Sequence, residues 1–111
     1  MNFLSHQVVV YSSAVDMRKQ YDSLMGLVRG EFDVLKGTLF LFVSRDRTRA
    51  KCLFWDGTGL NLWSKRLERG KFADVFNREE LTVNELKLFF EGSKEVSRRL
   101  SPPDLSARFS A

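Results

Sequence analysis

The sequence predicts a small single-domain α+β protein in which an antiparallel sheet of about four strands is packed by two helices. Three apolar segments in the middle of the chain are separated only by short turns, and strands joined in this way must be antiparallel neighbours. This excludes a doubly wound parallel sheet. One segment with apolar residues at helical spacing precedes these strands and a second follows them. The 111 residues, 43% of them hydrophobic, leave room for one domain with one core.

The first predicted strand spans residues 7–11, a β-branched and aromatic run. The clearest predicted helix follows it, because apolar residues recur there at spacings of three and four. Its apolar stripe consists of Met17, Tyr21, Leu24, Met25, Val28 and Phe32. Asp16, or Ser13 with Asp16 three residues on, is expected to cap the first turn, and Gly30 to end the helix. We expect the two methionines of the stripe to fill the core.

A three-stranded meander is predicted next. Residues 38–43 are apolar on both faces, which indicates a central strand that is covered on each side. Residues 44–49 form a polar, basic turn, and residues 50–55 a second strand. The tight turn 56–59 contains two glycines that suit positive φ angles, and residues 60–65 form the third strand.

The last third of the chain contains one further predicted helix. Residues 66–69 are compatible with a continuation of the third strand, Gly70 breaks it, and residues 72–76 are compatible with either a short edge strand or an irregular segment. Thr82 and Glu85 then form the Thr-x-x-Glu capping box of a helix. We take residues 1–96 as the domain and residues 97–111, with their serines and two prolines, as a mobile tail.

Cysteine and histidine are too few for a disulfide or a zinc site. Cys52 and His6 are the only residues of their types, so no internal disulfide and no set of three or four zinc ligands can form. No cofactor is predicted, and Cys52 is expected to be a buried structural thiol in an apolar strand. The start of the chain lacks a signal-peptide pattern, and no stretch approaches the ~20 apolar residues of a membrane span. We therefore expect a cytoplasmic protein without a membrane partner.

Positive charge is concentrated in the middle of the chain. The net charge is +4, yet residues 45–71 alone carry +5. The cations form two clusters: Arg45, Arg47 and Arg49 in one turn, and Lys65, Arg66, Arg69 and Lys71 at the end of the meander. In a meander these two places lie at the same end of the sheet. Such a surface suits the phosphates of a nucleic-acid backbone, so the sequence predicts DNA binding with little sequence readout.

Two tryptophans, Trp55 and Trp63, flank the tight turn of the meander. Aromatic rings exposed on a sheet can stack on unpaired bases. Packing under the helices is favoured over stacking, because the two residues lie on neighbouring antiparallel strands beside the turn that joins them.

Catalysis is the least favoured interpretation. The carboxylates that a metal-dependent nuclease could recruit are Asp16, Asp56, Asp74, Glu79 and Glu80. Asp16 is better explained as a helix cap, Asp56 as a turn residue and the two glutamates as the approach to the second helix. The sequence also lacks a glycine-rich phosphate loop and a nucleophile with a base beside it. It therefore predicts a protein that is not an enzyme.

Several motifs follow one another in a fixed order. They are Asp16-Met17-Arg18-Lys19 with Asp22 and Leu24, then Gly37-Leu39-Phe40-Phe42, then Phe54-Trp55-Asp56-Gly57-x-Gly59, then Trp63 and Lys65-Arg66-Leu67-Glu68-x-Gly70-Lys71-Phe72. Over about residues 8–92 this pattern resembles the TnpB accessory protein of insertion sequences of the IS-sixty-six type, encoded by their second reading frame. The chain departs from that family at Phe54, where tryptophan is frequent, and at Phe72-Ala73-Asp74, where a Trp-Pro pair is usual.

The resemblance implies a non-catalytic helper in DNA transposition, with a separate transposase and other element-encoded proteins as partners. Carried over by position, it adds Arg18 and Lys19 to the DNA-binding candidates. The motif residues that it marks are Asp16, Trp55, Asp56, Gly57, Trp63 and Gly70. A salt bridge to Asp16 or Glu68 is the structural alternative for Lys65 or Arg66. The alternative function is an adaptor that docks on the transposase through an exposed apolar patch without contacting DNA.

Overall fold

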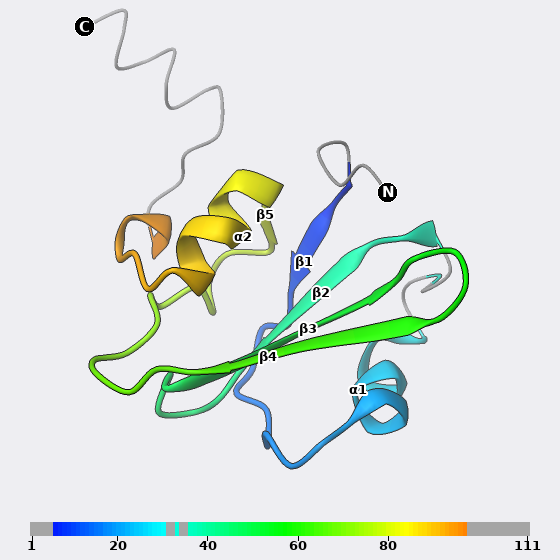
Figure 1. Ribbon diagram of the computed structural model, residues 1–111, viewed down its shortest axis with the longest axis horizontal. Coiled ribbons are helices and arrows are strands. Elements are labelled where there is room, and N and C mark those ends of the chain that lie inside the picture. Colours follow the sequence, from blue (N-terminus) through cyan, green and yellow to red (C-terminus); the bar gives the residue numbers. More distant parts are fainter. Residues whose placement is uncertain (1–5, 31–32, 34–35, 98–111) are drawn as a thin grey trace, which may run out of the picture.

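The computed structural model describes residues 6–30, 33 and 36–97, which form one sheet with a helix on each face (Figure 1). The strands are β1 (Val8–Val10), β2 (Leu39–Val43), β3 (Arg49–Trp55), β4 (Leu60–Arg66) and β5 (Glu80–Leu81). The helices are α1 (Tyr21–Val28), α2 (Val83–Phe90) and a 3₁₀ turn, η2 (Glu95–Ser97). Residues 98–111, nearly all of the predicted mobile tail, lie outside the described residues. No helix in the described ranges is long and apolar enough to cross a membrane.

The strand order is β4-β3-β2-β1-β5, and every neighbouring pair is antiparallel except β1 and β2. The predicted α+β class and the meander β2-β3-β4 are therefore confirmed. The sheet differs from the predicted antiparallel sheet of about four strands, because it has five strands and one parallel pair. The parallel pair arises because α1 lies between β1 and β2 in the chain and returns it to the same end of the sheet.

Strand β2 holds the two halves of the core together. Leu39, Leu41 and Val43 belong to the cluster under α2, whereas Phe40 and Phe42 belong to the cluster over α1. All five side chains are essentially inaccessible to solvent, as the two-sided apolar pattern predicted. Since a fully buried large apolar side chain contributes roughly 1.5–3 kcal/mol, this single strand supplies a substantial part of the driving force for folding.

Helix α1 begins later than its apolar stripe suggested. Its N-cap is Gln20, which makes no side-chain capping hydrogen bond, so both predicted caps, Asp16 and Ser13, are wrong. The preceding segment runs along β2 instead, because the amide of Val15 donates to the carbonyl of Val43 at 3.0 Å. Met17 precedes the helix, yet it packs with Met25 against the core on the α1 side, as expected of core-filling methionines. The helix ends at Val28 with Arg29 as its C-cap, which agrees with the predicted stop at Gly30. The stripe residue Phe32 lies outside the described residues.

Helix α2 is fixed at its start by the predicted capping box. The hydroxyl of Thr82 accepts from the amide of Glu85 at 3.1 Å, and the Glu85 carboxylate accepts from the amide of Thr82 at 2.9 Å. Glu85 is only 2% exposed and receives both terminal nitrogens of Arg78, at 2.7 and 3.1 Å. Arg78 also donates to the carbonyl of Val96, so one buried ion pair joins β5, α2 and η2.

The segment after β4, left open by the sequence, has no regular secondary structure over residues 67–76. Gly70 adopts a φ of 70°, which turns the chain back toward the sheet. Phe72 is then fully buried, and its ring stacks on Phe89 of α2 with centroids 4.6 Å apart. This segment is therefore part of the core although it belongs to no strand.

We predict that Glu85→Gln lowers the free energy of unfolding by about 3 kcal/mol, because it leaves the buried Arg78 guanidinium without its countercharge. Urea unfolding followed by circular dichroism measures the change. The matched control is Glu79→Gln, an exposed residue in the same segment, which should shift stability by less than about 0.5 kcal/mol. Equal midpoints for the two variants would contradict this account of the ion pair.

Candidate nucleic-acid interface

The two basic clusters meet at one end of the sheet, as the hairpin connections predicted. Arg49 of β3 pairs directly with Arg66 of β4. Beyond the strands, the amide of Leu67 donates to the carbonyl of Thr48 at 2.8 Å and continues the ladder into the turn between β2 and β3. Figure 1 shows this turn and the chain leaving β4 side by side at the left of the molecule. We call this end of the sheet the basic end, formed by Arg45, Arg47, Arg49, Lys65, Arg66, Arg69 and Lys71.

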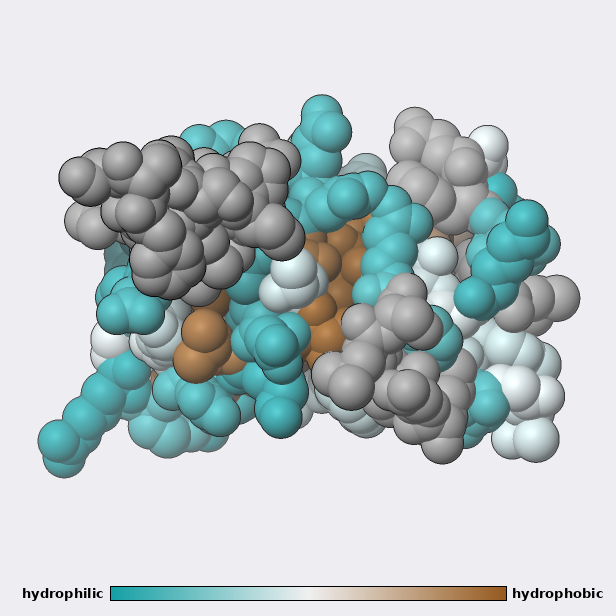
Figure 2. Space-filling model, turned by 90° about the horizontal axis from the view of Figure 1, so that it is seen from above, coloured by the Kyte–Doolittle hydropathy of each residue, from teal (hydrophilic) through white to brown (hydrophobic). Residues whose placement is uncertain are grey.

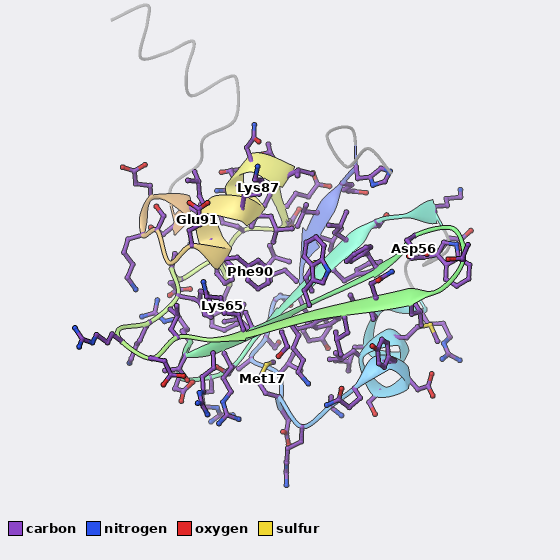
Figure 3. The ribbon with its side chains drawn as sticks, viewed as in Figure 1. Met17, Asp56, Lys65, Lys87, Phe90 and Glu91 are labelled. Carbon is purple, nitrogen blue, oxygen red and sulfur yellow. The ribbon has the colours of Figure 1, made fainter. Side chains whose placement is uncertain are left out.

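Adjacent strand residues point to opposite faces, so the basic end is divided between the two sides of the sheet. Arg49 and Arg66 occupy the α1 side, where Met17 also lies. Lys65 occupies the α2 side, because its partner Ala50 belongs to the core under α2. Figure 3 shows the labelled side chains of Lys65 and Met17 on opposite sides of the strands.

Arg49 and Arg66 form a cross-strand pair of like charges, which we call the arginine pair. Like charges directly opposite each other destabilise a sheet unless an anion lies near them. Arg66 has an ion pair with Glu68 at 3.0 Å, but its side chain remains 61% exposed. Together with Met17, Lys51, Ser64 and Lys65, the pair lines a shallow depression of about 290 Å³. Two guanidinium groups therefore face solvent over a concave surface.

Lys51 is the site residue that the sequence analysis did not single out. It lies between Arg49 and Leu53 on β3, is only 5% exposed, and points to the α1 side. Its ammonium donates to the backbone carbonyl of Lys19 at 2.7 Å. Burial lowers the pKa of Lys51, while the nearby Asp16 opposes that shift. The signal that could have found it is a cation within an otherwise apolar strand, on the same face as Arg49.

Lys65 has a structural role that its position in the sequence does not reveal. Its ammonium donates to the carbonyl of Phe90, the last residue of α2, at 2.6 Å. A cation at a helix C-terminus satisfies an otherwise unpaired carbonyl and interacts favourably with the helix dipole. The predicted alternative of a salt bridge to Glu68 holds for Arg66 and not for Lys65. The two neighbouring cations thus have different partners on different faces.

The turn between β2 and β3 is held by a single carboxylate. Asp46 accepts hydrogen bonds from the hydroxyl of Ser44 at 2.8 Å and from the amide and hydroxyl of Thr48 at 3.0 and 2.8 Å. The hydrogen bond from the Thr48 amide is the largest of several causes that lower the pKa of Asp46 to about 2, and Arg49 contributes weakly. The ionised carboxylate therefore fixes the turn that carries the three arginines of the first cluster.

Arg47 is used differently from its neighbours Arg45 and Arg49. It is a non-glycine residue with a positive φ, 58°, and its carbonyl accepts from the amide of Phe72 at 2.6 Å. Its side chain is 29% exposed and lies 3.9 Å from the carboxylate of Asp74. Arg47 therefore ties the segment after β4 to the turn, whereas Arg45 and Arg49 are exposed.

The other predicted cations are more scattered. Arg18 is almost fully exposed and bonds to Asp16, with nitrogen and oxygen 2.6 Å apart, which holds the pKa of Asp16 well below its usual range. Lys19 is half-buried and supplies the carbonyl that receives Lys51. Arg69 and Lys71 are exposed in the irregular segment at the basic end. The exposed members of the predicted set are thus Arg18, Arg45, Arg49, Lys65, Arg66, Arg69 and Lys71.

The motif residues around the β3–β4 turn lie at the opposite end of the sheet from the basic end. Asp56 accepts from the amides of Thr58 and Gly59 at 2.9 and 3.0 Å and from the Asn61 side chain at 2.9 Å. These bonds, that from Asn61 first, lower the pKa of Asp56. Gly57 has a φ of 103°, as the turn requires. Asp56 and Gly57 therefore set the turn, as the sequence suggested.

The two tryptophans differ in exposure. Trp55 is half-buried on the α1 side, consistent with packing. Trp63 lies on the α2 side, meets Phe54 edge to face with centroids 4.7 Å apart, and remains 45% exposed. The expectation that both tryptophans pack under the helices is therefore wrong for Trp63, because α2 stops short of covering it and leaves an apolar groove beside it.

The carboxylates considered for a nuclease do not come together. Asp16 lies with the arginines at the basic end, whereas Asp56 closes the turn at the other end of β3. Among the described residues, no group of three or more histidine, cysteine, aspartate or glutamate side chains is arranged to hold a metal ion. Cys52 is completely buried, as predicted, and burial raises the pKa of its thiol.

Comparison with known proteins gives a family and a similar protein from a bacterium. The sequence model of the TnpB_IS66 family, described as IS66 Orf2 like protein, matches residues 6–99. The chain is also similar to a protein of Sinorhizobium fredii (strain NBRC 101917 / NGR234) designated y4jC, with 35% identity over 68 residues. That alignment covers 60% of this chain and 58% of y4jC, so the chain spans little more than half of that relative. No solved structure matches the chain.

We predict that the stabilising contribution of Asp46 disappears in acid. Its pKa is lower in the folded protein, so the contribution is complete above the unfolded value of about 4 and is lost as the pH falls towards about 2. Wild type should therefore melt at a higher temperature than Asp46→Asn at pH 6, and the difference should shrink between pH 4 and pH 2. Thermal scans by circular dichroism test this, and a pH-independent difference would contradict it.

Proposed function

The chain belongs to the family of IS66 Orf2-like proteins, and from this premise we propose that it is a non-catalytic accessory protein of insertion-sequence transposition that binds DNA through its basic end. In this proposal it acts in the cytoplasm beside the transposase and other element-encoded proteins. The transposase, not this chain, would perform the chemistry on DNA.

The observation that carries the DNA-binding proposal is the arginine pair. Arg49 and Arg66 lie directly opposite each other on one face of the sheet. Lys51 is a third cation on the same face, and its ammonium donates to the carbonyl of Lys19. One carboxylate, Glu68, bonds to the pair through Arg66. Asp16 and Asp46 line the neighbouring depression with the pair and balance part of its charge. Guanidinium groups bind phosphate oxygens in a two-pronged geometry, which suits the two exposed side chains to a phosphate of DNA.

The geometry favours contact with the phosphate backbone over recognition of bases. The cations stand on strands and in turns at the end of a sheet, and no helix among the described residues projects from this end to enter a groove (Figure 1). Backbone contacts position a protein on DNA and release counterions, but they carry no sequence information. We therefore expect salt-sensitive binding with little preference for sequence.

Fluorescence anisotropy with an element-end duplex and a scrambled duplex, across a salt series, tests the proposal. The variant is Arg49→Ala with Arg66→Ala, chosen because neither side chain supports the core. Losing two phosphate contacts should reduce the slope of log affinity against log salt by roughly 1.8, at about 0.9 per contact. Lys65 is left unchanged, because its removal would loosen α2.

The matched control is Arg29→Ala with Lys36→Ala, two exposed cations outside the basic end. It removes the same charge and should keep the wild-type slope within error. An equal loss of slope in both variants would mean that net charge alone explains the binding. If the wild-type protein binds neither duplex at low salt, the DNA proposal is rejected. The adaptor function, tested with the transposase as bait, would then replace it.

A further inference from the structure

Strand β4 is a long and unprotected edge of the sheet. Among the described residues it is the outermost strand, seven residues long, and its one strand partner is β3. The other edge, β5, has two residues. Proteins usually protect an edge strand by making it short, by placing proline or charged residues in it or by bulging it, because its free backbone groups can pair with another strand. Strand β4 is long and has neither proline nor a bulge, and its two cations, Lys65 and Arg66, are confined to its last two residues.

The alternation of hydrogen bonds between β3 and β4 shows which backbone groups of β4 point away from the sheet. Asp56 donates to the carbonyl of Gly59 at 3.1 Å, and Leu67 donates to the carbonyl of Thr48. Because bonded pairs alternate along an antiparallel ladder, the odd-numbered residues of β4 bond to β3. The even-numbered residues direct their N–H and C=O groups away from the sheet, and these residues are Leu60, Leu62, Ser64 and Arg66.

Hydrophobic surface adjoins this edge. Trp63, at the centre of β4, is 45% exposed and lines a groove of about 520 Å³ with Val83, Leu86 and Phe90 of α2. Seen from the side that α2 covers, hydrophobic side chains show at the floor of a hollow between hydrophilic ones (Figure 2). Leu60 and Leu62 are half-buried on the opposite face. The edge therefore offers both backbone hydrogen bonds and apolar contacts.

We propose that β4 pairs with β4 of a second copy of this chain, antiparallel and centred on Trp63, to give a ten-stranded sheet. The alternation of hydrogen bonds restricts the register, because the even-numbered residues of one copy must form their backbone hydrogen bonds with even-numbered residues of the other. The register that pairs all seven residues places Leu60 opposite Arg66 of the second copy and Leu62 opposite Ser64. Trp63 then faces Trp63 across the two-fold axis, in a non-hydrogen-bonded pair where side chains approach closely.

Charge complementarity supports a second copy as the occupant of this edge. In the full register no cation of β4 lies opposite another cation. Lys65 lies opposite Asn61 of the second copy, whose amide is bonded to the carboxylate of Asp56. The cationic end of each strand thus meets the end that carries the ionised Asp56, so the edge is self-complementary in charge as well as in hydrogen bonding.

The dimer would change how the proposed DNA surface is displayed, although dimerisation through β4 does not depend on DNA binding. A two-fold axis perpendicular to the sheet leaves the α1 sides of both copies on one face. The two Arg66 residues would then lie roughly 20 Å apart along the strand direction, at about 3.4 Å per residue over six residues. Both arginine pairs would face the same side of the assembly.

Sedimentation equilibrium of the full chain, at tens of micromolar, tests the association. Wild type should have twice the monomer mass of 12.9 kDa. Trp63→Lys puts two ammonium groups opposite each other at the axis and should shift the protein to monomer. The matched control is Tyr21→Lys on α1, the other large hydrophobic residue of similar exposure at 44%, which should remain dimeric. A monomeric wild type, or a dimer that survives Trp63→Lys, would overturn the proposal.

Disulfide trapping tests the register separately and does not depend on the tryptophan. A cysteine in place of Trp63 faces itself across the axis, so Trp63→Cys should form a covalent dimer under mild oxidation. Ser64→Cys lies opposite Leu62 of the second copy and should cross-link much more slowly, and the native Cys52 is buried. Folding of each variant is verified by circular dichroism. Equal cross-linking at the two positions, or none at position 63, would reject the register.

Discussion

The whole structure depends on strand β2 being covered on both faces. Its leucines and valine face one helix and its phenylalanines the other, so neither α1 nor α2 could be removed without exposing half of the core. The parallel partner β1 and the antiparallel partner β3 follow from this central position. Because β2 leads directly into the basic turn, burial of the strand also fixes where the arginines of that turn emerge. The burial of β2 therefore determines both how the core packs and where the arginines of the turn are placed.

Local hydrogen bonds and ion pairs hold the basic end together against the mutual repulsion of its cations. Asp46 gathers the turn around one ionised carboxylate, Arg47 joins that turn to the buried Phe72, and Lys65 closes the end of α2. These contacts use some of the cations as structural parts and leave others exposed. Arg49 and Arg66 are the pair that this scaffold places directly opposite each other, with an ion pair from Arg66 to Glu68. The same charges placed farther apart would repel less, so this arrangement opposes the pairing of β3 with β4.

Much of the fold could be predicted because it is written in short-range patterns. The two-sided apolar run of β2, the turn around Asp56 and the capping box of Thr82 and Glu85 each depend on neighbouring residues only. The parallel pairing of β1 and the two-residue β5 depend on where α1 returns the chain, which no local pattern encodes. The start of α1 was misplaced for the same reason, because a hydrogen bond from Val15 to Val43 of β2 outweighs the apolar stripe.

The candidate site was predictable as a location but not as a set of roles. Hairpin connectivity was enough to bring the two clusters to one end of the sheet, whereas the separation of Lys65 from Arg66 depends on where α2 ends. The burial of Lys51 is not encoded locally, because lysine is rarely buried and this one is stabilised by the carbonyl of Lys19, which is distant in the sequence. Counting charges along a chain therefore locates a basic surface, but strand alternation decides which cations can reach a ligand. In this protein alternation assigns Arg49, Lys51 and Arg66 to one face and leaves Lys65 to hold the helix on the other.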